Sequence, residues 1–355
     1  MNQFSRLLSS TILFFSFSIH AQSADFISHE NIEIVSKLDI RPGNVTATTD
    51  GRVFATIHPM GGEFGLQLVE IKDGKAIAWP SQSVQAKLGQ YTDDTLDSPL
   101  GITKDKQGGL WLVDFGLRLG KTRIWGFDIA SGDLITKIDI PIEVAPLGSL
   151  AQDLAVDRIN GWVYIAATGT QSIIAVNLKT GEARSFSDHA SLQPDKDARL
   201  FFDGEELRFF GKPAREGINP ITLSDDSETI FFGPMTGTGW FSVPAKLFRD
   251  GASHETISAA IERVGDKPMS DGVATDATGN HYFTNLMESG IDMLDANGNL
   301  TPLIRDARFS WPDNVQVGET GTLYIAVNQL HKSAPATGGK DQGKAPYYIF
   351  RVTLP

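Results

Sequence analysis

The sequence contains no cysteine, so it can form neither disulfides nor a zinc site built on thiolates. It has no run of basic residues, and its formal net charge of −12 argues against a nucleic acid or an anionic membrane surface as partner. Its seven histidines lack the paired spacing of zinc ligands. A Gly-x-Ser-x-Gly motif is also missing, which leaves a serine triad without support. No long segment has a period of 3.6 residues, which argues against a helical solenoid.

One short pattern, by contrast, occurs six times. Each copy runs from an aliphatic residue through a polar turn containing Gly or Asp to an aromatic residue nine or ten positions later. The aromatic residues are Phe54, Trp111, Tyr164, Phe231, Tyr282 and Tyr324. A strand, a tight turn and a second strand account for each copy. Six such hairpins predict an all-β fold, a six-bladed β-propeller in which these aromatic residues pack between blades.

The two ends of the chain are expected to close the ring, because an open ring leaves two unpaired edge strands. Residues 32–40 alternate in the manner of a strand and precede the first copy of the pattern. We predict that they complete the last blade beside residues 348–352. The alternative is that they form a loose N-terminal extension.

The beginning of the chain has the pattern of a secretory signal peptide. Arg6 precedes an apolar run at residues 7–19, and the small residues Ala21, Ser23 and Ala24 follow. The apolar run is short for a membrane span, although an uncleaved anchor is the alternative. We therefore expect residues 1–24 to be the signal, residues 25–355 to form a single propeller domain, and the mature protein to be secreted or periplasmic and free of the membrane.

Several segments between the second blade and the C-terminus form an ordered set: WGFDI (125–129), LAVD (154–157), GWVYIA (161–166), residues 221–232 with VP (243–244), GDKP and SDG within 265–272, FSWPD (309–313), Tyr324 and NQL (328–330). Together they resemble the major royal jelly/yellow protein family. The resemblance implies a secreted six-bladed propeller. It implies no single activity, since members act on dopachrome, bind biogenic amines, or serve nutritional and assembly roles. This chain lacks the cysteines of the animal proteins, so nothing that depends on their disulfides carries over.

Polar residues precede the first strand of most blades, where they are expected to ring one mouth of the central channel. The candidate ligand-binding residues are Asn44, Gln152, Asp153, Asn219, Asp271, Asp313 and Asn314. Oxygen atoms that converge from separate blades suit a hard cation such as Ca²⁺, and carboxylates can also hold an amine or act as a general base. The structural alternative is that each Asp or Asn caps a turn by accepting hydrogen bonds from nearby backbone N–H groups.

Two of these residues carry a second resemblance. Asn219 in INPI (218–221) and Asp271 in SDGV (270–273) are similar to two metal ligands of the gluconolactonase/regucalcin family. This resemblance implies a site for Ca²⁺ or another divalent cation at Asn219 and Asp271. That family also takes a glutamate ligand from its first blade, where this chain has Pro42, Gly43 and Asn44 and no glutamate.

Three functions stay open. The leading hypothesis is a secreted or periplasmic propeller that binds a small polar or aromatic molecule at the channel mouth. The first alternative is a metal-dependent lactone hydrolase of the gluconolactonase type, in which a cation activates water. The second is a non-catalytic interaction or storage protein that acts through its rim. Residues 187–217 depart most from the rhythm of the blades, and we expect them to supply an outer strand and an exposed loop that can act as a lid.

Overall fold

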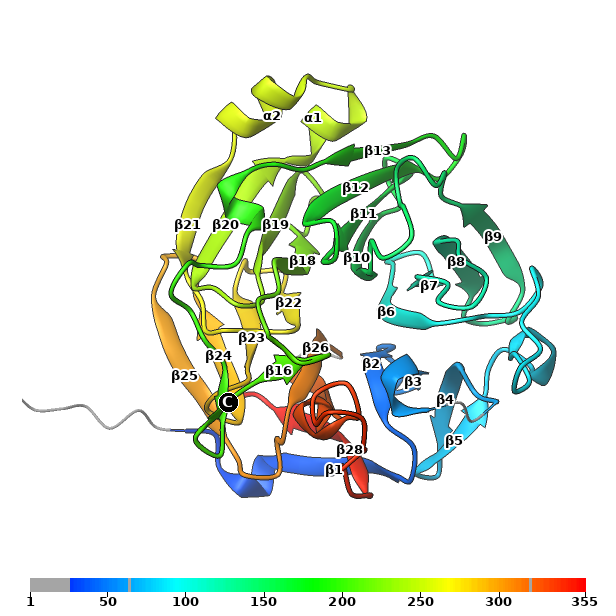
Figure 1. Ribbon diagram of the computed structural model, residues 1–355, viewed down its shortest axis with the longest axis vertical. Helices are drawn as coiled ribbons and strands as arrows, with labels where there is room; N and C mark the ends of the chain where they lie inside the picture. The colour runs from blue at the N-terminus through cyan, green and yellow to red at the C-terminus, as the bar shows by residue number, and fades with distance from the viewer. Residues whose placement is uncertain (1–25, 63–64, 319–320) are drawn as a thin grey trace, which may run out of the picture.

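The computed structural model describes residues 26–62, 65–318 and 321–355. Within these residues, six four-stranded antiparallel sheets are arranged radially around a central channel (Figure 1). The predicted all-β fold and six-bladed propeller are therefore confirmed. The signal peptide predicted for residues 1–24 lies outside the described residues and stays a prediction.

Five blades follow the chain from the innermost strand to the rim. Blade 1 contains β2 (Pro42–Ala47), β3 (Val53–Ile57), β4 (Leu68–Lys72) and β5 (Lys75–Ala78), and blade 2 contains β6 (Pro99–Lys104), β7 (Gly109–Asp114), β8 (Arg123–Asp128) and β9 (Leu134–Asp139). Blade 3 contains β10 (Ala151–Asp157), β11 (Trp162–Ala167), β12 (Ser172–Asn177) and β13 (Ala183–Phe186). Blade 4 contains β18 (Ile218–Leu223), β19 (Thr229–Pro234), β20 (Gly239–Pro244) and β21 (Glu262–Asp266), and blade 5 contains β22 (Val273–Thr275), β23 (His281–Asn285), β24 (Gly290–Leu294) and β25 (Leu300–Arg305).

Blade 6 joins the two ends of the chain. Its three inner strands are β26 (Pro312–Val317), β27 (Thr322–Val327) and β28 (Tyr347–Thr353), and its outer strand is β1 (Ile32–Leu38). β1 pairs antiparallel with β28, with Ile32 opposite Val352. The predicted closure of the last blade is confirmed. β1 ends at Leu38 rather than at residue 40, because the chain must bend there to enter blade 1.

The repeated aromatic residues lie in the second strand of each blade and form much of the core. Phe54, Trp111 and Tyr164 are fully buried, and Tyr324 of blade 6 packs among the aliphatic residues of blade 1. Phe231 is partly buried. A buried aromatic side chain removes 150–250 Å² from water, which stabilises the fold by roughly 4 to 6 kcal/mol. Contacts of this kind between blades hold the ring together without disulfides.

Helices are short and lie outside the blades. The described residues contain α1 (Ala245–Arg249) and α2 (His254–Ala259) at the rim of blade 4, and the 3₁₀ helices η1 (His29–Asn31), η2 (Pro59–Gly61), η3 (Gln82–Val84), η4 (Ala190–Leu192) and η5 (Leu330–Lys332) (Figure 1). Ser253 caps α2 by accepting a hydrogen bond from the backbone N–H of Thr256. Among the described residues, none of the helices has the length and apolar character needed to span a bilayer.

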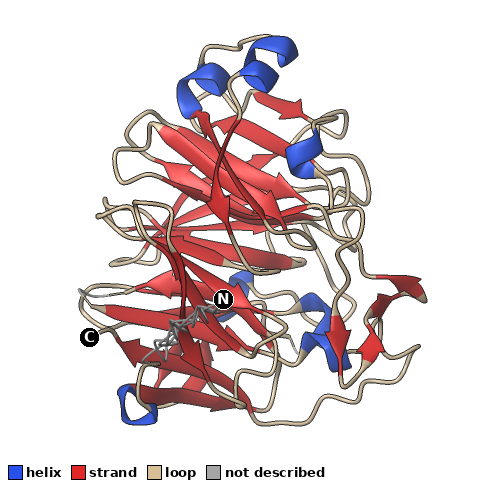
Figure 2. Ribbon diagram, turned by 90° about the vertical axis from the view of Figure 1, so that its left-hand side faces the viewer, coloured by secondary structure: helices blue, strands red, loops and turns tan. Residues whose placement is uncertain are grey.

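Two small hairpins interrupt the order of the blades between β13 and β18. β14 (Phe201–Phe202) pairs with β15 (Glu205–Glu206), and β16 (Arg208–Phe209) pairs with β17 (Lys212–Pro213). We call residues 200–214 the cap, because the hairpins stand out on one side of the disc (Figure 2). The outer strand expected within residues 187–217 is not formed there, since β13 already completes blade 3 before residue 187.

Candidate functional site

The polar residues predicted for the channel mouth lie at the start of the innermost strands. In blades 1, 2, 3, 4 and 6, the pairing of the innermost strand with its neighbour shifts register at this point. A β-bulge of this kind inserts an extra residue and turns its side chain out of the ladder. The bulges explain how two consecutive residues, such as Gln152 and Asp153, can both lie near the axis.

Neighbouring innermost strands approach each other closely at these bulges. A Cβ atom on Gly101 would lie 2.6 Å from the carbonyl oxygen of Gln152, and one on Gly272 would lie 2.7 Å from Cα of Asn314. Side chains do not fit in such gaps, so glycine is required at both positions. Thr284 of β23 then fixes the loop before β22, because its Oγ1 accepts hydrogen bonds of 3.1 Å from the N–H groups of Asp271 and Gly272.

Asp271 is the centre of the polar network. Its Oδ1 accepts hydrogen bonds from the side-chain amides of Asn219 in blade 4 and Gln152 in blade 3, the latter at 3.1 Å. Its Oδ2 accepts a bond of 2.8 Å from Nε1 of Trp311, which precedes blade 6. Asp271 itself belongs to blade 5 and is 3% exposed. One buried carboxyl group thus connects four blades.

The contributions of blades 1 and 6 meet beside this network. Oδ2 of Asp313 accepts a bond of 2.6 Å from Nδ2 of Asn328. Oδ1 of Asn314 accepts a bond of 3.1 Å from the backbone N–H of Val45, whereas its buried Nδ2 has no partner among the described residues. Asn44 is also buried, but blade 1 meets Asn314 and Asn328 of blade 6 through the backbone N–H of Val45 and the carbonyl oxygen of Pro42.

The structure therefore brings five of the seven candidate residues, Gln152, Asp153, Asn219, Asp271 and Asp313, into one network of hydrogen bonds and charge interactions, and Asn314 follows Asp313 on β26. We call Gln152, Asp153, Asn219, Asp271, Asp313 and Asn314 the hub cluster. Their role in binding a ligand stays a prediction. Asn328 and Trp311 complete the cluster as hydrogen-bond donors.

Burial raises the pKa values of the carboxyl groups in the hub cluster. It raises the pKa of Asp271 to about 7, although hydrogen bonds from Trp311 and Asn219 oppose the shift. Burial also raises the pKa of Asp153 to about 8. The pKa of Asp313 is raised well above its usual range, first by burial and then by the negative charge of Asp271. In all three groups, burial thus favours the protonated form over the ionised form.

Aromatic side chains cover the hub cluster on the side of the cap. The indole of Trp311 is fully buried, with the rings of Phe202 and Phe209 at centroid distances of 5.4 and 6.3 Å. Phe202 also stacks on His331 of η5 at 4.4 Å, and the backbone N–H of Phe210 donates to the carbonyl oxygen of Pro335 at 2.8 Å. Two insertions far apart in the sequence thus meet above the carboxyl groups.

The two residues proposed as metal ligands, Asn219 and Asp271, do contact each other, but the amide nitrogen of Asn219 faces the carboxylate. Rotation of the amide by half a turn would present its oxygen instead. Gln152 also faces Asp271 with its amide nitrogen, and the same rotation would be needed to present its oxygen. The two amide oxygens and the carboxylate of Asp271 would then form the type of oxygen donor set that a hard divalent cation prefers. Among the described residues, no three His, Asp or Glu side chains lie close enough together to hold a metal.

Glu216 is a further acidic group at the hub that the sequence did not suggest. Burial raises its pKa, and its charge contributes to the raised pKa of Asp271. Its backbone N–H donates to Oγ1 of Thr236 at 3.1 Å. Glu216 precedes β18 by two positions and lies outside the repeated pattern, so no feature of the sequence marked it.

Comparisons with solved structures support the fold alone. A gluconolactonase from Xanthomonas campestris superimposes with a TM-score of 0.57 and 14% identity, covering 94% of this chain and 96% of that chain. A streptogramin B lyase superimposes with a TM-score of 0.54 and 14% identity, covering 91% of this chain and 97% of that chain.

Sequence comparisons are more specific. The L-dopachrome tautomerase yellow-f of Drosophila melanogaster is 23% identical over 356 residues, covering 87% of this chain and 77% of the relative. Major royal jelly protein 7 of Apis mellifera is 25% identical over 165 residues, covering 42% of this chain and 36% of the relative. Residues 98–352 match the family described as major royal jelly protein. Because this match spans most of the chain and all strands of blades 2 to 5, the chain belongs to the major royal jelly protein family.

Proposed function

We propose that this protein binds a small polar aromatic molecule at the hub, between the hub cluster and the cap, and moves a proton on it. The observation that carries the proposal is the burial of Asp153, Asp271 and Asp313, from three different blades, under an aromatic cover. Burying three carboxyl groups near one another lowers the stability of the fold when the groups are ionised. Such clusters are typical of functional sites, where the shifted pKa values serve the chemistry.

The side chains around the hub cluster suggest the class of ligand. Asp271 and Asp313 can accept hydrogen bonds from an amine or a hydroxyl group, and Nδ2 of Asn314 is a donor that lacks a partner among the described residues. Phe202 and Phe209, which are only partly buried, offer aromatic surface on the other side of the ligand. An aromatic ring that carries amine, hydroxyl or carbonyl groups would match both sides.

Proton transfer is the chemistry that the raised pKa values favour. A general acid or base works best when its pKa is close to the pH of the reaction, and the pKa of Asp271 is about 7. In a tautomerisation, a proton leaves one atom of the substrate and another proton arrives at a second atom, so the molecule keeps its composition. One ionised and one protonated carboxyl group of the hub cluster supply the base and the acid. The Drosophila relative named L-dopachrome tautomerase supports this class of reaction.

Turnover of L-dopachrome by the purified protein tests the proposal. We expect Asp271→Asn and Asp313→Asn to lower kcat/KM by about 100-fold or more, because general acid–base groups contribute about 10²–10⁴ in rate. Asp94→Asn is the control, since the side chain of Asp94 is 96% exposed. If the two hub variants bind and convert dopachrome as the wild type does, or if the wild type neither binds nor converts it, the proposal is wrong.

A divalent cation at Asp271 is the alternative occupant of the hub, and it would support a metal-dependent lactone hydrolase. The convergence of Asp271 with the amides of Asn219 and Gln152 favours it. Metal analysis of the purified protein, together with lactone turnover before and after EDTA, distinguishes the two functions. Stoichiometric metal and EDTA-sensitive lactone turnover would favour hydrolysis over metal-free proton transfer.

The location of the protein is a separate proposal. We infer from the pattern at residues 1–24 that the protein is exported to the periplasm or beyond. N-terminal sequencing of the protein from its native host tests this inference. A mature chain that begins near residue 25 would support export, whereas a chain that retains residues 1–24 in the cytoplasm would refute it.

A further inference from the structure

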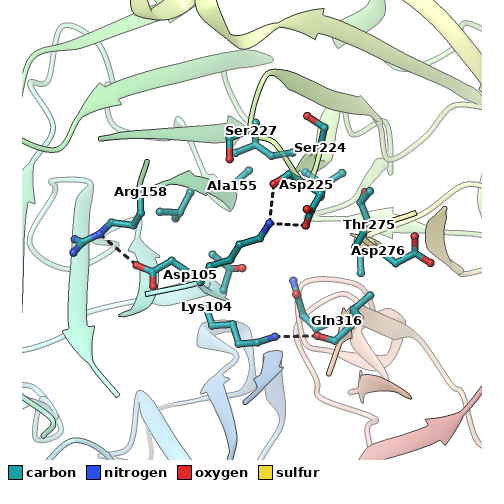
Figure 3. Close-up of a pocket in the computed structure, with 18 of the residues that line it drawn as sticks. Lys104, Asp105, Ala155, Arg158, Ser224, Asp225, Ser227, Thr275, Asp276 and Gln316 are labelled. Carbon is teal, nitrogen blue, oxygen red and sulfur yellow. Dashed lines mark hydrogen bonds and ion pairs between the residues drawn. The ribbon is translucent and has the colours of Figure 1, made fainter. Parts of the chain in front are cut away.

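A cavity of about 670 Å³ opens at the end of the channel opposite the hub cluster (Figure 3). Its walls are the last residues of the same innermost strands whose first residues form the hub. β10 runs from Ala151 to Asp157, so Arg158, one position beyond its end, lies roughly 15 Å from Asp153 along the strand. A cavity of this size holds a small organic ligand. It is therefore a space separate from the one considered under the proposed function.

The carboxylates that line this cavity already have partners. Asp105 accepts hydrogen bonds of 2.7 Å from the backbone N–H of Gly109 and from Nε1 of Trp111. Asp276 accepts a bond of 2.9 Å from the hydroxyl of Tyr282. Both carboxylates are thus held by their own hairpins. A cationic ligand would have to break these bonds to reach either one.

Two of the cations at the cavity are paired as well. Nζ of Lys106 lies 2.6 Å from Oδ1 of Asp225 in an ion pair between blades 2 and 4. Nε of Arg158 lies 3.5 Å from Oδ2 of Asp105. The positive charges of Lys106 and Arg158 are therefore already balanced by carboxylates of the protein. A ligand with two or three negative charges would therefore lack a second free cation.

Lys104 differs from these residues. Its Nζ donates to the carbonyl oxygen of Val317 at 3.0 Å, and among the described residues it forms no ion pair with a carboxylate. An ammonium group has three donors, so two of them remain for a ligand. Burial lowers the pKa of Lys104, which reflects the cost of a charge held away from water. An anion beside Nζ would remove that cost.

Neutral polar groups lie on the walls around Lys104. Thr103 precedes it on β6, Thr222 comes from β18 and Gln316 from β26. Hydroxyl and amide groups recognise the hydroxyl groups of a ligand, as donors and as acceptors. Because these wall groups are neutral, they do not favour a second charge on the ligand.

We propose that this cavity is a second binding site, which takes a small hydroxylated monocarboxylate with its carboxylate at Nζ of Lys104. Of the described cations that line the cavity, Lys104 is the one without an ion pair, which sets the charge of the ligand at minus one. The threonine hydroxyls and the amide of Gln316 account for its hydroxyl groups. The Lys106–Asp225 ion pair is exposed on both sides, so it is weak enough to open for entry.

Three sugars with one shared skeleton test the proposal: D-glucuronate, neutral D-glucose and cationic D-glucosamine. We expect D-glucuronate to bind the wild type in calorimetry with a Kd on the order of 1 mM, and the other two sugars to bind at least about tenfold more weakly. Lys104→Met keeps the apolar stem and is expected to weaken D-glucuronate binding by about tenfold or more. Lys179→Met is the control, because Lys179 is exposed and lies in blade 3 away from the cavity.

Lys104→Arg keeps the positive charge and is expected to retain D-glucuronate binding, which covers the case in which Lys104→Met does not fold. Three results would overturn the proposal: no saturable binding of D-glucuronate to the wild type up to about 50 mM, equal affinity in Lys104→Met, or equal affinity for the three sugars. Loss of D-glucuronate binding in Asp313→Asn but not in Lys104→Met would place the sugar at the hub and would also overturn it.

Discussion

Trp311 of blade 6 donates its indole N–H to Oδ2 of Asp271 in blade 5 at 2.8 Å. To do so, Trp311 adopts a φ of 63°, a left-handed conformation that is rare for a bulky residue. Such a conformation costs of order 1–3 kcal/mol and persists only where the surroundings fix it. Here the buried hydrogen bond and the contact with Phe202 fix it. The backbone entering blade 6 is thus strained in the conformation that brings a donor to the central carboxyl group.

Replacing Trp311 by phenylalanine is expected to raise the pKa of Asp271 further. The indole N–H stabilises the ionised carboxylate, so its loss favours the protonated form. A hydrogen bond to a charged group contributes about 1.5–3 kcal/mol, which corresponds to a shift on the order of one unit or more. Carbon NMR titration of Asp271 measures it, and an unchanged pKa in Trp311→Phe would contradict the prediction.

Asp153→Asn is expected to change how stability depends on pH. The pKa of Asp153 rises from the ordinary value of 3.8 to about 8 in the folded protein because the group is buried. Its contribution to stability is therefore present below pH 3.8 and is lost as the pH rises to about 8. Asparagine cannot ionise, so the variant avoids this loss.

Relative to the wild type, the free energy of unfolding of Asp153→Asn should increase by about 1.4 kcal/mol for each pH unit in that window. Urea titrations at several pH values measure the difference. Taking the difference cancels the opposite trends of buried histidines such as His281, whose pKa burial lowers to about 4. Asp94→Asn should show no such trend, and a difference for Asp153→Asn that is independent of pH would refute the prediction.

Leu207→Ala is expected to release the cap while leaving the blades folded. Leu207 is 6% exposed and packs in the same cluster as Leu200 and Trp311. Deleting a buried leucine side chain costs about 2–5 kcal/mol, and the small hairpins have few other contacts to offset it. Limited proteolysis should then cut within residues 200–214. Leu147→Ala is the control, because Leu147 is 74% exposed; equal resistance in both variants would show that the cap does not depend on this contact.

Ile32→Ala tests the closure of the ring. Ile32 is 6% exposed and belongs to the core cluster that contains Phe350 and Val352. We expect a loss of about 2–4 kcal/mol in denaturant unfolding, because the outer strand of blade 6 would be anchored less firmly. Ile34 lies on the same strand but is 39% exposed, so Ile34→Ala should cost less than about 1 kcal/mol. Similar losses in both variants would indicate that β1 adds little to the last blade.

The blades were predictable because their signals are local. Turn residues, alternation and an aromatic residue such as Trp111 each act within a dozen positions, and their repetition sets the register of the innermost strands. That register also placed Gln152, Asn219 and Asp271 near one axis. Their hydrogen bonds confirm that the three side chains meet.

The remaining features depend on contacts that no local pattern encodes. The left-handed conformation of Trp311 leaves no mark in the sequence, so its bond to Asp271 could not be foreseen. The stacking of Phe202 on His331 joins two irregular insertions that have no periodicity. In the sequence, nothing distinguishes Lys104 from other lysines near the end of a strand. Its place in the wall of a cavity becomes visible only when the blades are arranged in a ring.

The pairing of β1 with β28 also constrains how the protein is made. β1 is the first strand to be synthesised and β28 is the last. Residues 32–38 therefore cannot pair in the last blade until synthesis of the chain is almost complete. Contacts between such distant parts of a polypeptide form slowly. Asp313 enters the hub from the same late blade, and a prematurely terminated chain would therefore lack both a closed ring and a complete ligand site.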